Sequence, residues 1–155
     1  MNNANFKIVL VEPEIPQNTG NIGRTCVGTG SELHLIKPFG FEITDKNLKR
    51  AGLDYWQYLK WYTYENFEEW LKTVPDINRV FFFSTKASKS YYEIRYKPGD
   101  YLVFGRETKG LSTEIIETYK DQLIKIPQYG PVRSLNVATA AAIALYEGLR
   151  QVNPQ

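Results

Sequence analysis

The sequence contains very few of the side chains that build metal centres and covalent catalytic sites. Its 155 residues include one cysteine, Cys26, and one histidine, His34. A single cysteine excludes an internal disulfide, and one histidine beside it cannot complete a Cys/His metal cluster, although a magnesium site made of carboxylates stays open. His34 falls in an expected strand and Cys26 in the apolar part of an expected helix, which disfavours Ser-His-Asp and Cys-His catalysis. We expect no metal.

The sequence also lacks a long hydrophobic run and a strong excess of charge. No segment approaches the roughly 18 apolar residues of a membrane span, and the N-terminus has no basic region followed by a long apolar run. We therefore expect a cytoplasmic protein without membrane contact. A net charge of +2 does not by itself predict nucleic-acid binding, so any RNA-binding surface must be local.

The composition that remains is that of a globular protein. Hydrophobic residues make up 43% of the chain and charged residues 23%, which are ordinary globular values. A chain of this length can bury a sizeable core without disulfides or metals. We predict one domain over residues 1–155, with no separate RNA-binding extension.

Apolar runs and helical patterns alternate along the chain. Strands are predicted at 6–11, 33–36, 79–84, 101–104 and 122–127. Helices are predicted after Asn18 or Thr19, either of which can cap the first one, then over 45–52, within 66–73, from Ser112 onward and after Ser134. The first helix should end near Gly28 or Gly30. Short connections between alternating elements predict an α/β fold with a parallel sheet covered by helices.

Two stretches have an unusual composition. The segment 54–70 is crowded with aromatic residues, which can stack on bases, but packing in the core or between subunits is the interpretation that we favour. The segment 126–147 joins a Gly/Pro loop, a potential Ser134 cap and an alanine-rich helix. A helix that is apolar on several faces is usually packed on several sides, and small side chains let another backbone approach closely.

Three turns that follow predicted strands are dense in glycine, asparagine and charged residues. They are NTGNIGR (18–24), FGRETKG (104–110) and PQYGPVRSLN (127–136). Ligands of open parallel sheets bind at the carboxyl ends of strands, so these turns form the candidate site. The first turn contains neither G-x-G-x-x-G nor a Walker lysine, which disfavours those nucleotide sites. Its Asn18, Asn21 and Arg24 instead suit a phosphate or a sugar.

In combination these motifs resemble those of the SPOUT RNA methyltransferases, in the SpoU ribose-methylating branch. The resemblance rests on NTGNIGR, on FGRETKGL (104–111) and on RSLN (133–136) before the alanine-rich helix; EPEIPQNTGN and GLDYW extend it to the small TrmL/YibK-like tRNA (cytidine/uridine-34) 2′-O-methyltransferases. It covers residues 6–152. It implies a parallel sheet with helices on both faces and a deep C-terminal trefoil knot, a homodimer, S-adenosylmethionine as methyl donor, and the tRNA anticodon stem-loop as substrate.

The resemblance also implies roles for single residues. The cofactor-binding positions are Phe83, Gly105, Glu107, Ile126, Ser134 and Leu135, with Asn136 supporting the loop. Arg24 is the catalytic arginine, with Asn21 setting its geometry, and the RNA-contacting residues are Arg24, Lys86 and Arg133. Because a guanidinium rarely gives up its proton, we expect Arg24 to hold a phosphate and stabilise the developing alkoxide rather than act as base. Arg106 replaces the smaller residue or proline common in the family.

Three other functions fit part of the pattern. A SpoU-type methyltransferase acting on ribosomal RNA or on another tRNA position would share every motif. A non-catalytic RNA-binding module of the same fold would keep the fold without transferring methyl groups. A nucleotide or sugar-phosphate enzyme of Rossmann type is disfavoured by the missing glycine fingerprint.

Overall fold

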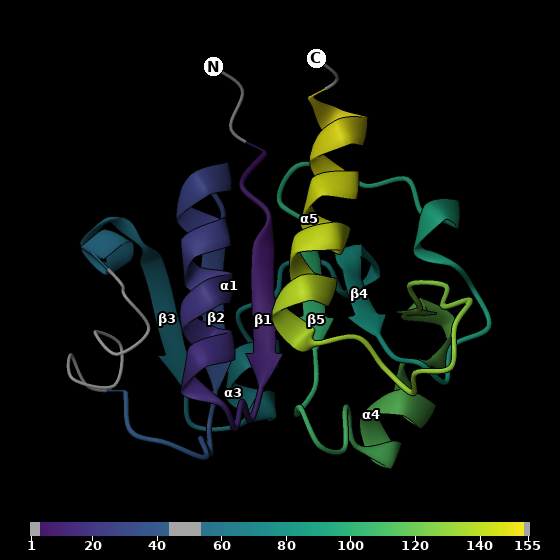
Figure 1. Cartoon of the computed structure of the whole chain (residues 1–155), viewed down its shortest axis with the longest axis horizontal. Coiled ribbons are helices and arrows are strands. Elements are labelled where there is room, and N and C mark those ends of the chain that lie inside the picture. The colour runs from purple at the N-terminus through teal and green to yellow at the C-terminus, as the bar shows by residue number, and fades with distance from the viewer. Residues whose placement is uncertain (1–3, 44–53, 154–155) are drawn as a thin grey trace.

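The fold is built on a six-stranded, fully parallel sheet. The computed structural model describes residues 4–43 and 54–153. The strands lie in the order β3-β2-β1-β5-β4-β6 (Figure 1). Their bounds are β1 Lys7–Val11, β2 Glu32–Ile36, β3 Lys60–Tyr64, β4 Val80–Phe83, β5 Tyr101–Phe104 and β6 Leu123–Ile124. The predicted parallel α/β fold is confirmed.

Helices cover both faces of this sheet. They are α1 Pro16–Thr29, α3 Phe67–Leu71, α4 Thr113–Thr118 and α5 Val137–Val152, with 3-10 turns at 54–58, 77–79, 91–93 and 120–122. In Figure 1, α1 and α5 lie side by side over one face. Their apolar residues share one core cluster with alternate strand residues, while those of α3 and α4 join the cluster on the opposite face.

The central strands are buried on both sides because their apolar residues are continuous. In β1, Ile8 and Leu10 belong to the core under α1 and α5, whereas Val9 and Val11 belong to the other core. Successive residues of a strand point to opposite faces, so such a run is stable only when both faces are covered. All residues of β4 and β5 are likewise buried, as predicted for these strands.

The aromatic segment forms an edge strand that the sequence pattern did not predict. β3 pairs with β2; its Trp61 and Tyr64 are half-buried and its other three residues are exposed. The strand was not predicted because its sequence, KWYTY, mixes aromatic and polar residues and has no aliphatic run. The preferred interpretation of the aromatics as packing residues is confirmed for Trp56, Trp61 and Trp70, which lie in or against the core clusters. Tyr58 is an exception, with 72% of its surface exposed.

The predicted helix starts need two corrections. α1 begins at Pro16 after Ile15, which gives no side-chain cap, so neither Asn18 nor Thr19 caps it. Proline suits the first helical turn because its missing N–H would be unpaired there anyway. α5 is capped by Asn136, whose Oδ1 accepts from the backbone N–H groups of its first turn, and not by Ser134.

Two other predicted boundaries are confirmed, whereas the strand predicted at 122–127 spans only Leu123–Ile124. Gly30 ends α1 with a left-handed φ of 68°. Ser112 caps α4 by accepting from the N–H of Ile115. The helix predicted over 45–52 lies outside the described residues. Among those that are described, no helix is long and apolar enough to cross a membrane.

The small residues of α5 allow close packing, as their composition predicted. Ala141, Ala144 and Gly148 are buried. A Cβ atom added to Gly148 would lie 2.9 Å from the ring of Phe6, so only glycine leaves that ring in place. α5 thereby packs beside α1 and against β5, and its N-terminal end lies at the candidate site.

Candidate active site

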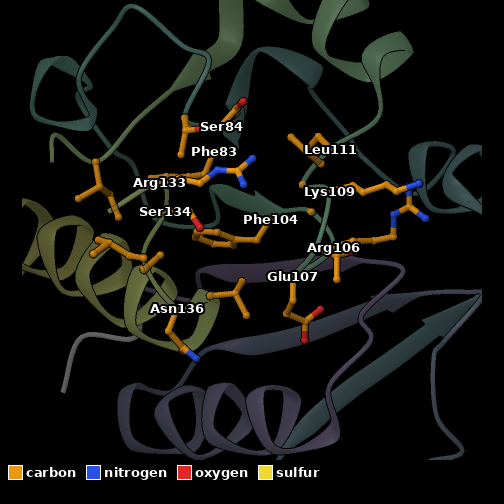
Figure 2. Close-up of a pocket in the computed structure, with 18 of the residues that line it drawn as sticks. Phe83, Ser84, Phe104, Arg106, Glu107, Lys109, Leu111, Arg133, Ser134 and Asn136 are labelled. Carbon is orange, nitrogen blue, oxygen red and sulfur yellow. The ribbon is translucent and has the colours of Figure 1, made fainter. Parts of the chain in front are cut away.

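A cavity of about 770 Å³ opens at the carboxyl ends of β4, β5 and β6 (Figure 2). The turns after these strands form its walls, and the starts of α1 and α5 complete it. Its lining includes Ile15, Asn18, Phe83–Lys86, Phe104–Leu111, Lys125, Ile126, Gln128 and Arg133–Val137. The predicted turns 104–110 and 127–136 therefore do meet at one edge of the sheet, as the strand-end rule requires. The predicted turn 18–24 is instead part of α1, and only its Asn18 lines the cavity.

The predicted site residues fall into two groups. Those expected to bind the cofactor all line the cavity: Phe83, Gly105, Glu107, Ile126, Ser134, Leu135 and Asn136. Lys86 and Arg133, the expected RNA contacts, line it as well. Asn21 and Arg24 do not line it and are exposed on α1, where the Arg24 guanidinium lies 6.0 Å from the ring centre of Tyr55. The cavity thus contains the expected binding residues without the expected catalytic arginine.

Two stacked rings form an apolar part of the wall. Phe83 ends β4 and Phe104 ends β5, and their ring centres are 4.6 Å apart at an interplanar angle of 16°. Both side chains are buried, at 8% and 3% exposure. The part of these rings that lines the cavity is apolar, so an aromatic or aliphatic group can pack against it.

The turn after β5 folds back on itself. The N–H of Gly110 donates to the carbonyl of Arg106 at 2.8 Å, and the N–H of Arg106 donates to the carbonyl of Gly110 at 3.2 Å. Gly110 has a left-handed φ of +67°, which glycine adopts without strain. A Cβ atom at Gly105 would overlap the backbone of Gly110 and Leu111. Both glycines are therefore required by the shape of this turn.

The carboxylate of Glu107 caps α1 from a distant part of the chain. Its two oxygens accept from the backbone N–H groups of Glu14 and Ile15, each at 2.9 Å, and Ile15 lies 92 residues away in sequence. In return, Glu14 accepts from the backbone N–H and the hydroxyl of Thr108, both at 2.9 Å. We call this reciprocal pair the Glu14–Glu107 clasp. It supplies the cap that Ile15 lacks.

Asn18 extends the clasp to α5. Its Nδ2 donates to Glu107 at 3.3 Å, and its Oδ1 accepts from Nδ2 of Asn136 at 3.1 Å. Figure 2 shows Glu107 and Asn136 directed toward α1. Asn136 also caps α5, so one hydrogen-bonded network joins all three turns. Sequence reasoning missed the part of Glu14, because only contacts across the fold identify its partner.

The charged side chains that line the cavity are mostly positive. Five cations line it, Lys86, Arg106, Lys109, Lys125 and Arg133, and the one carboxylate is that of Glu107. The Glu107 oxygens are already bonded to α1. Just outside the cavity, the Thr108 hydrogen bonds and the charges of Arg106 and Lys109 lower the pKa of Glu14 below its ordinary value. Such a site favours a ligand that carries negative charge, as a polynucleotide does.

Removing the Glu107 carboxylate is expected to destabilise the protein. In Glu107→Ala the N–H groups of Glu14 and Ile15 lose their acceptor, at a cost of about 1–2 kcal/mol in the free energy of unfolding. Urea unfolding followed by circular dichroism measures this change. Glu117→Ala is the matched control, since Glu117 is exposed on α4, and it should stay within about 0.5 kcal/mol of the unchanged protein. Equal stability of both variants would contradict the capping role.

The chain is similar over nearly its whole length to one family of RNA-modifying proteins. The profile of the SpoU rRNA methylase family matches residues 5–146. A tRNA (cytidine(34)-2′-O)-methyltransferase of Saccharophagus degradans is 48% identical over 95% of this chain and 96% of its own. A relative of the same description from Aeromonas hydrophila subsp. hydrophila is 47% identical over 94% of this chain and 93% of its own.

Solved structures agree with these relatives. One that concerns the 2-OH methylation of C/U34 on tRNA superposes with a TM-score of 0.91, at 45% identity and 97% coverage of both chains. The SpoU methyltransferase AviRb from Streptomyces viridochromogenes, in complex with the cofactor AdoMet, has a TM-score of 0.84 at 22% identity. It covers 99% of this chain and 60% of its own, and at that identity it is a likeness of fold.

Proposed function

The chain belongs to the SpoU rRNA methylase family, and we propose that it transfers a methyl group from S-adenosylmethionine to the ribose 2′-oxygen of nucleotide 34, a cytidine or uridine, in tRNA. The observation that carries this proposal is that all the motif residues expected to bind the cofactor line one cavity. Relatives at 47–48% identity that bear this activity in their description support the substrate.

The cavity residues suit an S-adenosyl ligand. The stacked Phe83 and Phe104 rings offer an apolar wall, and the turns around Gly105 and Ser134 bring backbone and hydroxyl groups to the same space. We assign cofactor binding to these turns, from Gly105 to Glu107 and from Ile126 to Asn136. Within them, Glu107 and Asn136 hold the turns against α1, as their hydrogen bonds indicate.

In this proposal the chain's own residues position and stabilise the reacting ribose. When bound, S-adenosylmethionine supplies an electrophilic methyl group. Transfer of that methyl group to the ribose 2′-oxygen would release S-adenosylhomocysteine, and the hydroxyl proton would pass to phosphate or water. Arg24 holds the neighbouring phosphate and stabilises the charge developing on the oxygen, with Asn21 three residues away on the same face of α1.

We also propose a homodimer, a C-terminal trefoil knot and a cytoplasmic location, with residues 1–155 acting as one methyltransferase domain. The dimer is supported by exposed apolar side chains on and beside α1 and α5, with Ile15 at 40%, Val132 at 58% and Tyr146 at 58%. Light scattering should then give twice the chain mass of 17.9 kDa. The knot is supported by the path of the chain from edge strand β6 back to α5 beside β5 and α1.

Arg133 and Lys86 are expected to contact RNA phosphate. Both are exposed at the cavity. Replacing either by alanine should weaken tRNA binding and reduce the slope of log affinity against log salt by about 0.7 for each phosphate of a single-stranded loop that the protein no longer neutralises. Filter binding across a salt series measures this slope. Lys72→Ala is the control, because Lys72 directly follows α3 and forms an exposed pair with Glu69. Undiminished affinity at low and high salt would remove the residue from the RNA surface.

Methyl transfer by the purified protein tests the proposed function. Labelled S-adenosylmethionine is offered with bulk tRNA and, separately, with ribosomal RNA. We expect label in tRNA at nucleotide 34. Label in ribosomal RNA alone would instead indicate the other SpoU-type substrate, and absence of both cofactor binding and transfer would indicate a non-catalytic RNA-binding module.

A further inference from the structure

One buried polar atom of the cavity has no hydrogen-bond partner. Oε1 of Gln128 is buried and accepts no hydrogen bond from any residue that the structure describes. Gln128 is among the residues that line the cavity. A buried acceptor left unpaired costs free energy, so folded proteins rarely leave one without a purpose.

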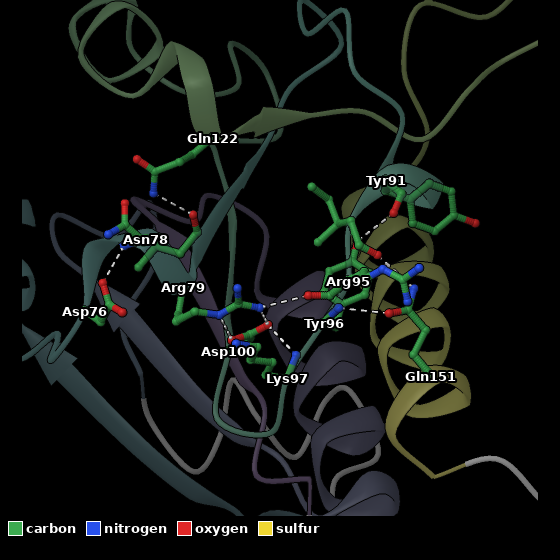
Figure 3. A network of polar contacts seen from close by, with 12 residues as sticks. Asp76, Asn78, Arg79, Tyr91, Arg95, Tyr96, Lys97, Asp100, Gln122 and Gln151 are labelled. Carbon is green, nitrogen blue, oxygen red and sulfur yellow. Dashed lines mark hydrogen bonds and ion pairs between the residues drawn. The ribbon is translucent and has the colours of Figure 1, made fainter.

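The other half-buried glutamines of the described chain are hydrogen-bonded. Nε2 of Gln122 donates to the carbonyls of Ile77 and of Val80, the latter at 2.9 Å. Gln151 accepts from the N–H of Tyr96 at 2.8 Å and donates to the carbonyl of Ile94 at 3.0 Å (Figure 3). Gln128 therefore differs from two residues of the same type and similar burial.

Among the described residues, only Gln128 both lines the cavity and has a buried side-chain atom without a hydrogen-bond partner. Thr19 Oγ1 and Trp70 Nε1 are also buried without a partner, but neither residue lines the cavity. The chain just before Gln128 is anchored, because the N–H of Lys125 donates to the carbonyl of Lys89 and its carbonyl accepts from Tyr91. These hydrogen bonds fix the backbone at the end of β6, three residues before Gln128.

We propose that Oε1 of Gln128 accepts a hydrogen bond from an N–H or O–H group of the bound S-adenosyl ligand. This inference rests on the proposed function. The ligand offers three kinds of donor, the adenine amino group, the ribose hydroxyls and the ammonium of the methionine part. Gln128 is then a residue that selects the cofactor, and its amide becomes satisfied only in the complex.

The substitution Gln128→Met separates this role from a structural one. Methionine has nearly the shape of glutamine and no strong acceptor, so the ligand donor would face an apolar atom. Calorimetry with S-adenosylhomocysteine should show a Kd raised by a factor of about 10. The thermal midpoint of the ligand-free protein should not fall, because the Oε1 atom that is removed has no partner there.

Gln122→Met is the matched control. It removes the hydrogen bonds to Ile77 and Val80, so the thermal midpoint should fall while the Kd stays within about twofold. Wild-type protein that binds no S-adenosylhomocysteine would overturn the proposed function itself. Wild-type binding with an equal Kd for Gln128→Met would overturn this inference alone, as would a thermal midpoint lowered as much as in Gln122→Met.

A second ligand identifies the donor. 5′-Methylthioadenosine keeps the adenosine part and lacks the amino-acid part. If Gln128→Met weakens its binding by the same factor, the donor belongs to the adenosine. If Gln128→Met weakens the binding of S-adenosylhomocysteine but leaves that of 5′-methylthioadenosine unchanged, the donor is the ammonium group. An S-inosyl analogue, in which a carbonyl replaces the adenine amino group, then separates the base from the ribose.

Discussion

The Arg24→Ala variant is expected to lose methyl transfer while it still binds S-adenosylmethionine. Arg24 is exposed on α1 and does not line the cavity, so its removal leaves the binding walls in place. Removing a group that stabilises developing charge in the transition state should lower kcat by about 10²–10³-fold. Calorimetry for the cofactor and single-turnover transfer to tRNA measure the two effects separately.

Two further variants make this result specific. Arg150→Ala removes an arginine from the last turn of α5, roughly 20 Å along that helix from the cavity end, and should transfer at the unchanged rate. Arg24→Lys keeps the charge and loses the planar fork that suits phosphate, so its rate should lie between those of arginine and alanine. Unchanged turnover in Arg24→Ala would remove Arg24 from the mechanism.

The Gly105→Ala variant is expected to lose both stability and cofactor binding. The added methyl group would overlap the backbone of Gly110 and Leu111, which cannot move aside as a flexible side chain would. Opening the turn would break the paired hydrogen bonds between Arg106 and Gly110. We expect the free energy of unfolding to fall by about 3 kcal/mol or more, measured by urea unfolding.

Gly28→Ala is the control for Gly105→Ala, and we expect it to raise stability instead of lowering it. Gly28 lies within α1, and a Cβ atom there would meet nothing within 4 Å. Alanine is the better helix former, so this variant should be more stable by about 0.5–1 kcal/mol. Equal stability of Gly105→Ala and Gly28→Ala would contradict the claim that the backbone of Gly110 and Leu111 leaves no room for a side chain at Gly105.

The buried strands and the location of the site were predictable because both follow from local composition. Runs such as the one that forms β4 are apolar throughout, so they must be buried on both faces. The turns after β1, β5 and β6 meet because parallel strands end at one edge of the sheet. These conclusions need no knowledge of which residue touches which.

The helix caps were not predictable from local sequence. The acceptor at the start of α1 comes from Glu107, 92 residues beyond Ile15, and no local signal marks that pairing. At α5, Ser134 and Asn136 are both good capping residues two positions apart, and the hydrogen bond from Asn136 to Asn18 accompanies the choice of Asn136. β3 was missed because edge strands tolerate polar residues.

Nucleoside mass spectrometry of bulk tRNA, from cells with and without this protein, tests the proposed function most directly. We expect 2′-O-methylated cytidine or uridine at position 34 to disappear when the protein is absent and to return when it is supplied again. Supplying the Arg24→Ala variant should not restore the modification. Unchanged 2′-O-methylation at nucleotide 34 in cells that lack the protein would contradict the proposed substrate.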